Sequence, residues 1–216
     1  MWGGNYFKVI VVDRLMKNKI KNWQSSLGRP EEKFKEPGQY YSKERVEKYS
    51  QSSGMKKAQE RIANRILELL QIKGGKILDL GCGVGYTTNV YREKGFEVMG
   101  VDKLPRMLEK AREKGLDVKE GDMRELSKII KCEVEAIVSA SALQWISIEE
   151  VRNVAREFKK VLKDKGEVII QFYPCSREEM MRVARQFKRE GFKGRIIVDN
   201  PDRPKKREIY LVFIKD

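Results

Sequence analysis

Short apolar runs alternate with amphipathic stretches between residues 76 and 189, and this pattern constrains the fold most strongly. It predicts seven strands, at residues 76–80, 97–101, 116–119, 135–139, 167–173, 195–198 and 209–214. Strands rich in β-branched residues that alternate with helices are typical of a doubly wound, mostly parallel sheet. The turn before the last strand is too short for a crossover helix. We therefore expect a Rossmann-like α/β fold whose C-terminal strand is antiparallel.

The helices are predicted from apolar spacing and from residues that favour helix ends. They are expected over residues 42–72, from the glycine turn to about 94, and at 105–114, 147–162 and 176–189. The last two each open on a capping-box pair, Ser147 with Glu150 and Ser176 with Glu179. Gly74-Gly75 is expected to end the first helix.

The first 39 residues lack this regularity. Tyr6 to Val12 is consistent with a strand, and Arg29-Pro30 and Pro37-Gly38 mark breaks. We therefore divide the chain into an N-terminal arm of undetermined structure at residues 1–39 and one domain at residues 40–216.

The composition excludes several kinds of chemistry. The 216 residues contain no histidine, which removes every mechanism built on imidazole and every His-ligated zinc site. The 3 cysteines have no C-x-x-C spacing, so we expect no disulfide scaffold, no bound metal and a reducing cytoplasm. No apolar run reaches the roughly 18 residues of a membrane span, and no signal peptide is recognised.

The net charge of +14 is unevenly distributed along the chain. Residues 76–146 hold 12 basic and 12 acidic side chains, whereas residues 177–207 hold 11 basic and 5 acidic ones. A neutral centre with basic flanks suits a cofactor-binding core whose flanks meet a polyanion. A solvated, lysine-rich surface is the alternative explanation.

The first predicted strand runs into a glycine turn with the sequence Asp79-Leu80-Gly81-Cys82-Gly83-Val84-Gly85. Glycine lets the backbone turn tightly and approach a ligand closely, and the next helix offers free N–H groups at its start. The spacing G-x-G-x-G differs from the G-x-G-x-x-G of dinucleotide folds. Asp102 ends the second strand, where an acid can accept hydrogen bonds from both ribose hydroxyls.

The third strand is followed by Gly121-Asp122-Met123. Asp122 is placed to accept from an exocyclic adenine amine, and Met123 to pack on the ring. Three acids at three successive strand ends suit a nucleoside that carries a positive charge. They suit a negatively charged pyrophosphate less well. A nicotinamide- or nucleotide-binding domain is the competing interpretation.

These three motifs in order resemble class I S-adenosylmethionine-dependent methyltransferases. By this resemblance the three loop glycines contact the methionine portion of the cofactor, and Asp79 organises the turn and the cofactor amine. Asp102 holds the ribose, Asp122 and Met123 hold the adenine, and Tyr49 covers the cofactor. The full predicted set is Tyr49, Asp79, Gly81, Gly83, Gly85, Asp102, Lys103, Asp122, Met123 and Ser139.

More specific elements resemble one family, the small-subunit ribosomal RNA guanine-N7 methyltransferases. The resemblance extends from about Tyr40 to Phe213. Its distinctive stretches are Gln144-Trp145, Gln171 to Pro174, Gly191 to Gly194, and Val198-Asp199 with Pro201. It implies methyl transfer to guanine N7 of small-subunit (16S/18S) ribosomal RNA. It also implies a small zinc-binding activator protein that extends the sheet beside the third strand.

The chain departs from that family in three places. It lacks the long basic tail of eukaryotic members, it has Gly54 where an arginine is expected before Met55, and its first 39 residues have no counterpart. These departures concern how RNA is held and which nucleotide is methylated.

The predicted reaction needs no general base, because guanine N7 is a neutral nitrogen with a free lone pair. The enzyme must align donor and acceptor and exclude water. We expect Tyr173, Trp145 and Tyr41 to form the base pocket through aromatic contacts. Core packing is an equally good explanation for Trp145, and Cys175 is expected to have no catalytic role.

Two other functions fit the same residues. The first is methylation of a small molecule, because the glycine turn is shared throughout the superfamily. The second is a ribosome-assembly factor that binds RNA and whose catalysis is secondary. A small-molecule methyltransferase should have no affinity for RNA, which separates the first alternative from an RNA methyltransferase. If ribosome assembly survives a substitution of Asp102 by alanine that abolishes methylation, the second alternative holds.

Overall fold

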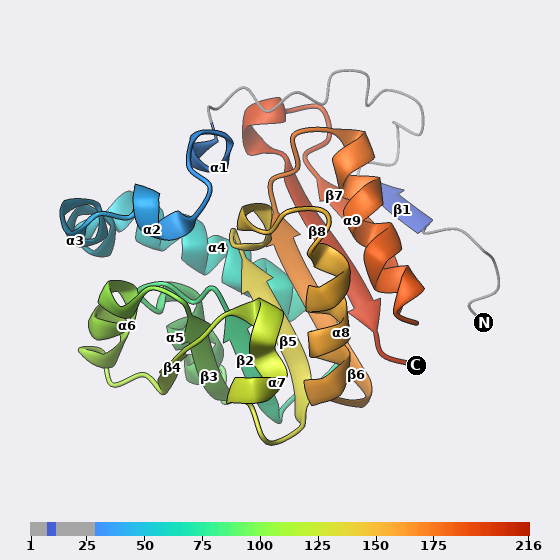
Figure 1. Cartoon of the computed structure of the whole chain (residues 1–216), viewed down its shortest axis with the longest axis horizontal. Helices are drawn as coiled ribbons and strands as arrows, with labels where there is room; N and C mark the ends of the chain where they lie inside the picture. The colour runs from blue at the N-terminus through green and yellow to red at the C-terminus, as the bar shows by residue number, and fades with distance from the viewer. Residues whose placement is uncertain (1–7, 12–28) are drawn as a thin grey trace.

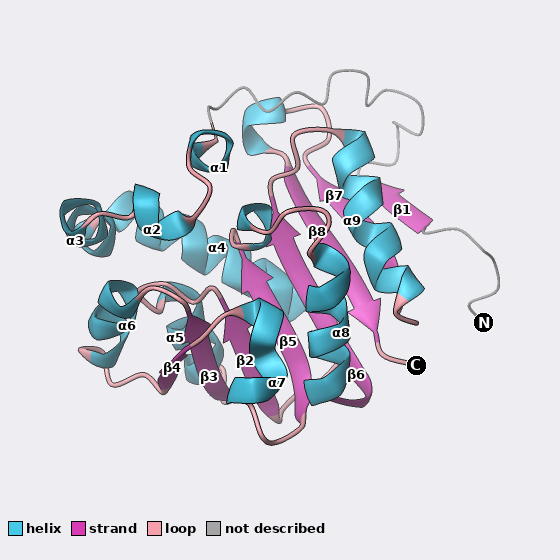
Figure 2. Cartoon of the chain, in the orientation of Figure 1, coloured by secondary structure: helices cyan, strands magenta, loops and turns pink. Residues whose placement is uncertain are grey.

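The computed structural model describes residues 8–11 and 29–216, which form a single sheet with helices on both faces (Figures 1 and 2). The strands are β1 (Lys8–Val11), β2 (Lys76–Leu80), β3 (Glu97–Asp102), β4 (Val118–Glu120), β5 (Val134–Ala140), β6 (Leu162–Phe172), β7 (Lys193–Asp199) and β8 (Glu208–Ile214). Their order across the sheet is β1-β7-β8-β6-β5-β2-β3-β4. The reversal of order beside β2 and β5 is the feature that opens a ligand crevice in such sheets.

The seven predicted strands are confirmed as β2 to β8. All their pairings are parallel except those of β8, which is antiparallel to both β6 and β7, as the short preceding turn requires. An eighth strand, β1, pairs in parallel with β7. It falls within the stretch Tyr6 to Val12, of which residues 6, 7 and 12 lie outside the described part, as do residues 12–28 of the predicted arm.

The helices are α1 (Pro30–Lys33), α2 (Pro37–Tyr40), α3 (Lys43–Gln51), α4 (Ser53–Leu69), α5 (Tyr86–Glu93), α6 (Pro105–Arg112), α7 (Leu126–Ile129), α8 (Val151–Val161) and α9 (Arg177–Arg189). Three 3₁₀ turns join them, η1 (Met123–Glu125), η2 (Leu143–Trp145) and η3 (Pro204–Lys206). No described helix is long and apolar enough to cross a membrane.

Two apolar cores hold the layers together, one on each face of the sheet. On one face α7, α8 and α9 pack against the sheet around Phe158, Phe187 and Phe213. On the other face α4 and α5 pack around Ile62, Ile66 and other fully buried side chains. Burying the aromatic and branched side chains supplies the main driving force for this arrangement.

The first predicted helix differs from the prediction in two ways. The helix expected over residues 42–72 is divided at Ser52, which has extended backbone and accepts a hydrogen bond from Met55 N–H at 3.2 Å. The helix also ends at Leu69 rather than at Gly74-Gly75. Leu70 is extended and buried, so the chain turns there to fill the core before it reaches β2.

Only one of the two predicted capping boxes caps its helix. Ser176 Oγ accepts from Glu179 N–H at 3.0 Å and begins α9 as expected. The prediction for Ser147 was wrong, because α8 begins at Val151 with Glu150 as its N-cap. Ser147 Oγ instead donates to the Glu150 carboxylate at 2.9 Å, while Ile146 and Ile148 pack against the core and turn the chain.

This contrast gives a direct test of the helix ends. Ser176→Ala removes a cap hydrogen bond and should lower the free energy of unfolding by about 1 kcal/mol. The matched change Ser147→Ala removes only a surface contact and should cost under about 0.5 kcal/mol. Urea unfolding of both variants measures the difference, and equal losses would contradict the assignment of the caps.

Candidate active site

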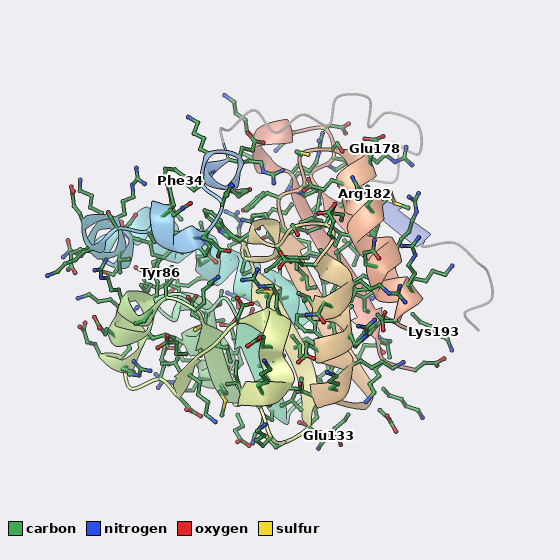
Figure 3. All side chains as sticks on the ribbon, in the orientation of Figure 1. Phe34, Tyr86, Glu133, Glu178, Arg182 and Lys193 are labelled. Carbon is green, nitrogen blue, oxygen red and sulfur yellow. The ribbon has the colours of Figure 1, made fainter. Side chains whose placement is uncertain are left out.

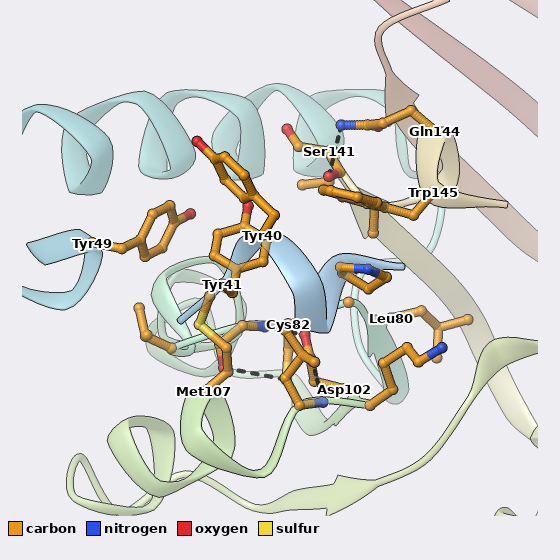
Figure 4. A pocket seen from close by; sticks show the side chains of 18 of the residues that line it. Tyr40, Tyr41, Tyr49, Leu80, Cys82, Asp102, Met107, Ser141, Gln144 and Trp145 are labelled. Carbon is orange, nitrogen blue, oxygen red and sulfur yellow. Dashed lines mark hydrogen bonds between the residues drawn. The ribbon is translucent and has the colours of Figure 1, made fainter. Parts of the chain in front are cut away.

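A cavity of about 730 Å³ opens at the carboxyl ends of β2, β3 and β5, beneath α1, α2 and α3 (Figure 4). Its floor is the glycine turn and its walls carry the acidic strand ends and several aromatic rings. This volume and position suit a nucleoside-sized ligand.

The glycine turn brings backbone to the floor of the cavity. Gly81 has a φ of 71°, and a Cβ there would lie 2.3 Å from the Cβ of Ala142. Gly83 has a φ of 55° and faces the cavity. Both positions therefore require glycine, for conformation at each and for space at Gly81.

Asp102 joins the end of β3 to this turn. One carboxylate oxygen accepts from Gly83 N–H at 2.9 Å and the other accepts from Leu104 N–H at 2.9 Å. Burial raises the pKa of Asp102, while the two N–H groups and the charge of Lys103 act in the opposite direction. Each oxygen can still accept a second hydrogen bond from a ligand in the cavity.

Asp122 lies at the neighbouring strand end within a network of charges. Its carboxylate accepts from the Arg124 guanidinium at 2.6 and 3.0 Å, and Lys103 Nζ lies 3.3 Å away. Lys103 also contacts Glu36 at 2.5 Å. Burial alone would raise the pKa of Asp122, but its bonds to Arg124 and the charge of Lys103 lower it. Asp122 is therefore an ionised acceptor at the cavity wall.

Three residues of the predicted cofactor set, Asp79, Gly85 and Ser139, are not among the residues that line the cavity. Gly85 is the N-cap of α5, and a Cβ there would lie 2.2 Å from Leu116. Ser139 Oγ donates to the Leu80 carbonyl at 2.9 Å within the sheet. Gly85 and Ser139 therefore support the glycine turn on the side away from the cavity.

Asp79 is 1% exposed and holds the start of α5. One of its oxygens accepts from the Thr87 and Thr88 hydroxyls at 2.6 and 2.7 Å, and the other has no partner among the described residues. Burial raises its pKa to about 6, against the lowering effect of the two hydroxyls. Asp79 thus joins the end of β2 to the start of α5 through these two hydroxyls.

An aromatic cluster closes the side of the cavity opposite Asp102 (Figure 4). The Trp145 ring lies 6.2 Å from those of Tyr40 and Tyr41, and Tyr41 meets Tyr49 edge-on at 6.2 Å. Burial raises the pKa of Tyr41 to about 12, so this phenol is neutral at physiological pH. Tyr173, with 38% of its side chain exposed, completes the lining. The predicted pocket residues Tyr41, Trp145 and Tyr173 therefore share one cavity with seven of the ten predicted cofactor residues.

Residues Arg29 to Tyr41 form a wall that the sequence pattern did not reveal. Arg29 is buried, with its guanidinium bonded to Glu31 at 2.6 Å and to Glu179 at 3.3 Å. Glu36 is the N-cap of α2 in a capping box with Gln39, a sequence signal that would have located this helix. A second cavity of about 440 Å³ adjoins this wall, and Gln144 and Trp145 line both cavities.

The described residues fit S-adenosyl-L-methionine. The Asp102 oxygens are placed for the two hydroxyls of a ribose, and Asp122 with Met123 lines the wall beside them. Gly81 and Gly83 line the floor, and neither adds a side chain there. No group of three or more His, Cys, Asp or Glu side chains within residues 8–11 and 29–216 is arranged to hold a metal ion.

Comparison with known proteins identifies the family of this chain. A methyltransferase domain model matches residues 77–166, from β2 to β6. The 18S rRNA (guanine-N(7))-methyltransferase of Bos taurus is 32% identical over 189 residues, covering 81% of this chain and 67% of that protein. The 18S rRNA (guanine(1575)-N(7))-methyltransferase of Saccharomyces cerevisiae is 30% identical over 189 residues, covering 82% and 68%. The chain belongs to this methyltransferase family.

Solved structures agree on the fold of this family member. A structure from Methanococcus maripaludis, described as a putative S-adenosyl-L-methionine-dependent methyltransferase, superposes with a TM-score of 0.67 at 18% identity, covering 81% of this chain and 93% of that one. A Pyrococcus horikoshii protein gives a TM-score of 0.64 at 22% identity, covering 77% and 93%. At these identities the likeness concerns the fold alone.

The buried Asp79 gives a pH-dependent prediction. Its pKa is raised by folding, so its contribution to stability is complete below about pH 4 and is lost as the pH rises through about 6. Asp79→Asn should therefore stabilise the ligand-free protein by up to about 3 kcal/mol at pH 7.5, and the gain should vanish near pH 4. Denaturant unfolding at both pH values measures this, with the exposed Asp117→Asn as control. A variant less stable than the wild type at pH 7.5 would contradict the account.

Proposed function

We propose that this protein transfers the methyl group of S-adenosyl-L-methionine to N7 of a guanine in small-subunit ribosomal RNA. The observation that carries the proposal is that one cavity contains both a surface for the methyl donor and a surface for a base. The half around Asp102 suits the donor, and the half around Trp145, Tyr41 and Tyr173 suits a flat base. Membership of the 18S rRNA (guanine-N(7))-methyltransferase family supports guanine N7 as the acceptor.

The arrangement matches the demands of methylation at guanine N7. The bound donor supplies an electrophilic sulfonium methyl group, and the N7 lone pair attacks it without prior loss of a proton. The protein must therefore hold the two reactants in line and keep water away, which can lower the barrier by several kcal/mol. Asp102 fixes the donor half, and the neutral phenol of Tyr41 beside the Trp145 ring gives an apolar surface for the base.

The edge of the sheet that holds the cavity also carries unpaired cations. The turn after β7 contains exposed Arg203, Lys205 and Lys206, none of which forms an ion pair with another described residue. Arg152 and Arg156, by contrast, are both bonded to Glu190. Arg182 of α9 is also paired, with Glu149 at 3.7 Å, and Figure 3 shows Lys193 at the opposite end of the strands. Unpaired cations near the cavity suit the phosphates of an RNA strand.

A partner site is proposed at the other end of the sheet. β4 is the last strand in the sheet order and pairs on one side with β3, while no described strand covers its outer side. An uncovered strand edge is a template for a further strand from another chain. The resemblance to the ribosomal RNA enzymes favours a small zinc-binding activator protein as the occupant.

The test is methylation of undermethylated small ribosomal subunits with radiolabelled S-adenosyl-L-methionine, with and without the cognate activator protein. We expect label on N7 of a single guanine, mapped by chemical cleavage at 7-methylguanine, and more label when the activator is present. Heat-denatured enzyme is the control.

Each other outcome points to a different function. Label on small metabolites but not on RNA would replace the proposal with a small-molecule methyltransferase. Donor binding with no label on either, combined with tight binding to the subunit, would identify an assembly factor instead. Label that is independent of the activator would contradict only the proposed partner.

A further inference from the structure

Ser141 stands at the carboxyl end of β5 in an unusual backbone conformation. Its φ is 57°, in the left-handed region that residues other than glycine seldom adopt. Such conformations are strained and are retained where the surrounding structure enforces them, often at functional sites. Ser141 belongs to the cavity wall, so its conformation presents the residue to the cavity.

Two glutamine side chains hold Ser141 in this conformation. The Gln171 Oε1 atom, from β6, accepts from Ser141 N–H at 3.1 Å and from its hydroxyl at 2.9 Å. Gln144 Nε2, from η2, donates to the Ser141 carbonyl at 2.9 Å, the contact drawn in Figure 4. Because each amide meets a fixed backbone partner, neither can be reversed without losing a hydrogen bond.

The hydroxyl of Ser141 is the adaptable part of this cluster. If it turns toward a ligand, Gln171 Oε1 still accepts from Ser141 N–H, which also donates to the Gln171 carbonyl at 3.0 Å. Gln171 Oε1 therefore keeps a donor when the hydroxyl turns, so the change carries no large penalty. Ser141 can therefore offer a hydrogen-bond donor to a base in the cavity.

Ser141 also occupies the right part of the cavity. It directly precedes Ala142, whose Cβ fills the space against Gly81 of the glycine turn. On its other side, Trp145 and Tyr173 line the same cavity. Ser141 therefore stands between the floor that suits the donor and the rings that suit the base.

Guanine and adenine differ in the exocyclic group on C6, which lies on the same edge of the base as N7. Guanine presents two acceptors on this edge, N7 and O6, whereas adenine presents N7 and the N6 amino donor. A hydroxyl that donates to O6 holds N7 in place and leaves its lone pair free. The same hydroxyl gains no such bond from a purine that lacks O6.

We propose that Ser141, fixed by Gln144 and Gln171, is a substrate-positioning residue that selects guanine by donating its hydroxyl to O6. This inference rests on the proposed function and adds the group that reads the base. Gln144 and Gln171 act through Ser141, by holding its backbone and directing its side chain.

The test compares small ribosomal subunits assembled from RNA that carries guanine or 2-aminopurine at the methylated position, with the activator protein present. 2-Aminopurine keeps N7 and lacks O6. The wild type should methylate the guanine RNA at least about 100-fold more efficiently in kcat/KM, because sites built around a hydrogen bond reject analogues that lack it. In Ser141→Ala this ratio should fall below about tenfold, with binding of S-adenosyl-L-methionine unchanged.

Two further variants isolate the effect. Ser147→Ala removes an exposed hydroxyl beside the second cavity and should keep the full ratio. Gln144→Ala should lower the ratio partly, because the Ser141 carbonyl loses its donor. If Ser141→Ala methylates neither RNA, the Gln144→Ala ratio decides the question.

The outcomes separate the inference from the function on which it rests. Methylation of the guanine RNA with an unchanged ratio in Ser141→Ala, or in Gln144→Ala where the first variant is inactive, overturns the role of Ser141 alone. Absence of label on the guanine RNA with wild-type enzyme and bound donor overturns the proposed function, and the inference with it.

Discussion

The carboxylate of Asp102 connects the fold of this protein to its chemistry. Two backbone N–H groups, from Gly83 and Leu104, bond to its two oxygens at 2.9 Å and fix the end of β3 against the glycine turn after β2. Parallel strands place these ends at one edge of the sheet, so a single carboxylate can order the turn and face the ligand together. The glycine conformations and the position of Asp122 follow from the same geometry.

The second half of the site is built by contacts between distant parts of the chain. Arg29 reaches Glu179 across 150 residues, and Glu36 reaches Lys103 across 67. These ion pairs hold residues 29–41 over the cavity, where Tyr41 meets Trp145. A partly enclosed site excludes water and strengthens the electrostatic interactions inside it, which suits transfer of a cationic methyl group.

Most of the fold could be predicted from the sequence, because the spacing of apolar residues along the chain was enough to locate its strands. The period of apolar residues located β2 to β8, and Asp102 and Asp122 were found because they end successive strands. The wall at Arg29 was missed because its ion pairs are long-range, and the start of α8 was misplaced because core packing of Ile146 and Ile148 outweighed the Ser147 signal. The sequence assigned Ser141 no role of its own, because a left-handed serine has no sequence signature.

Calorimetric titration of S-adenosyl-L-methionine into wild-type protein and Asp102→Asn tests the central claim most directly. The amide keeps the shape of the side chain but loses its charge and one acceptor oxygen, so we predict at least about tenfold weaker binding with an unchanged circular dichroism spectrum. Glu120→Gln, at the exposed end of β4, should bind as the wild type does. Binding by Asp102→Asn within about twofold of the wild type would contradict the account, because Asp102 would then order the turn without holding the donor.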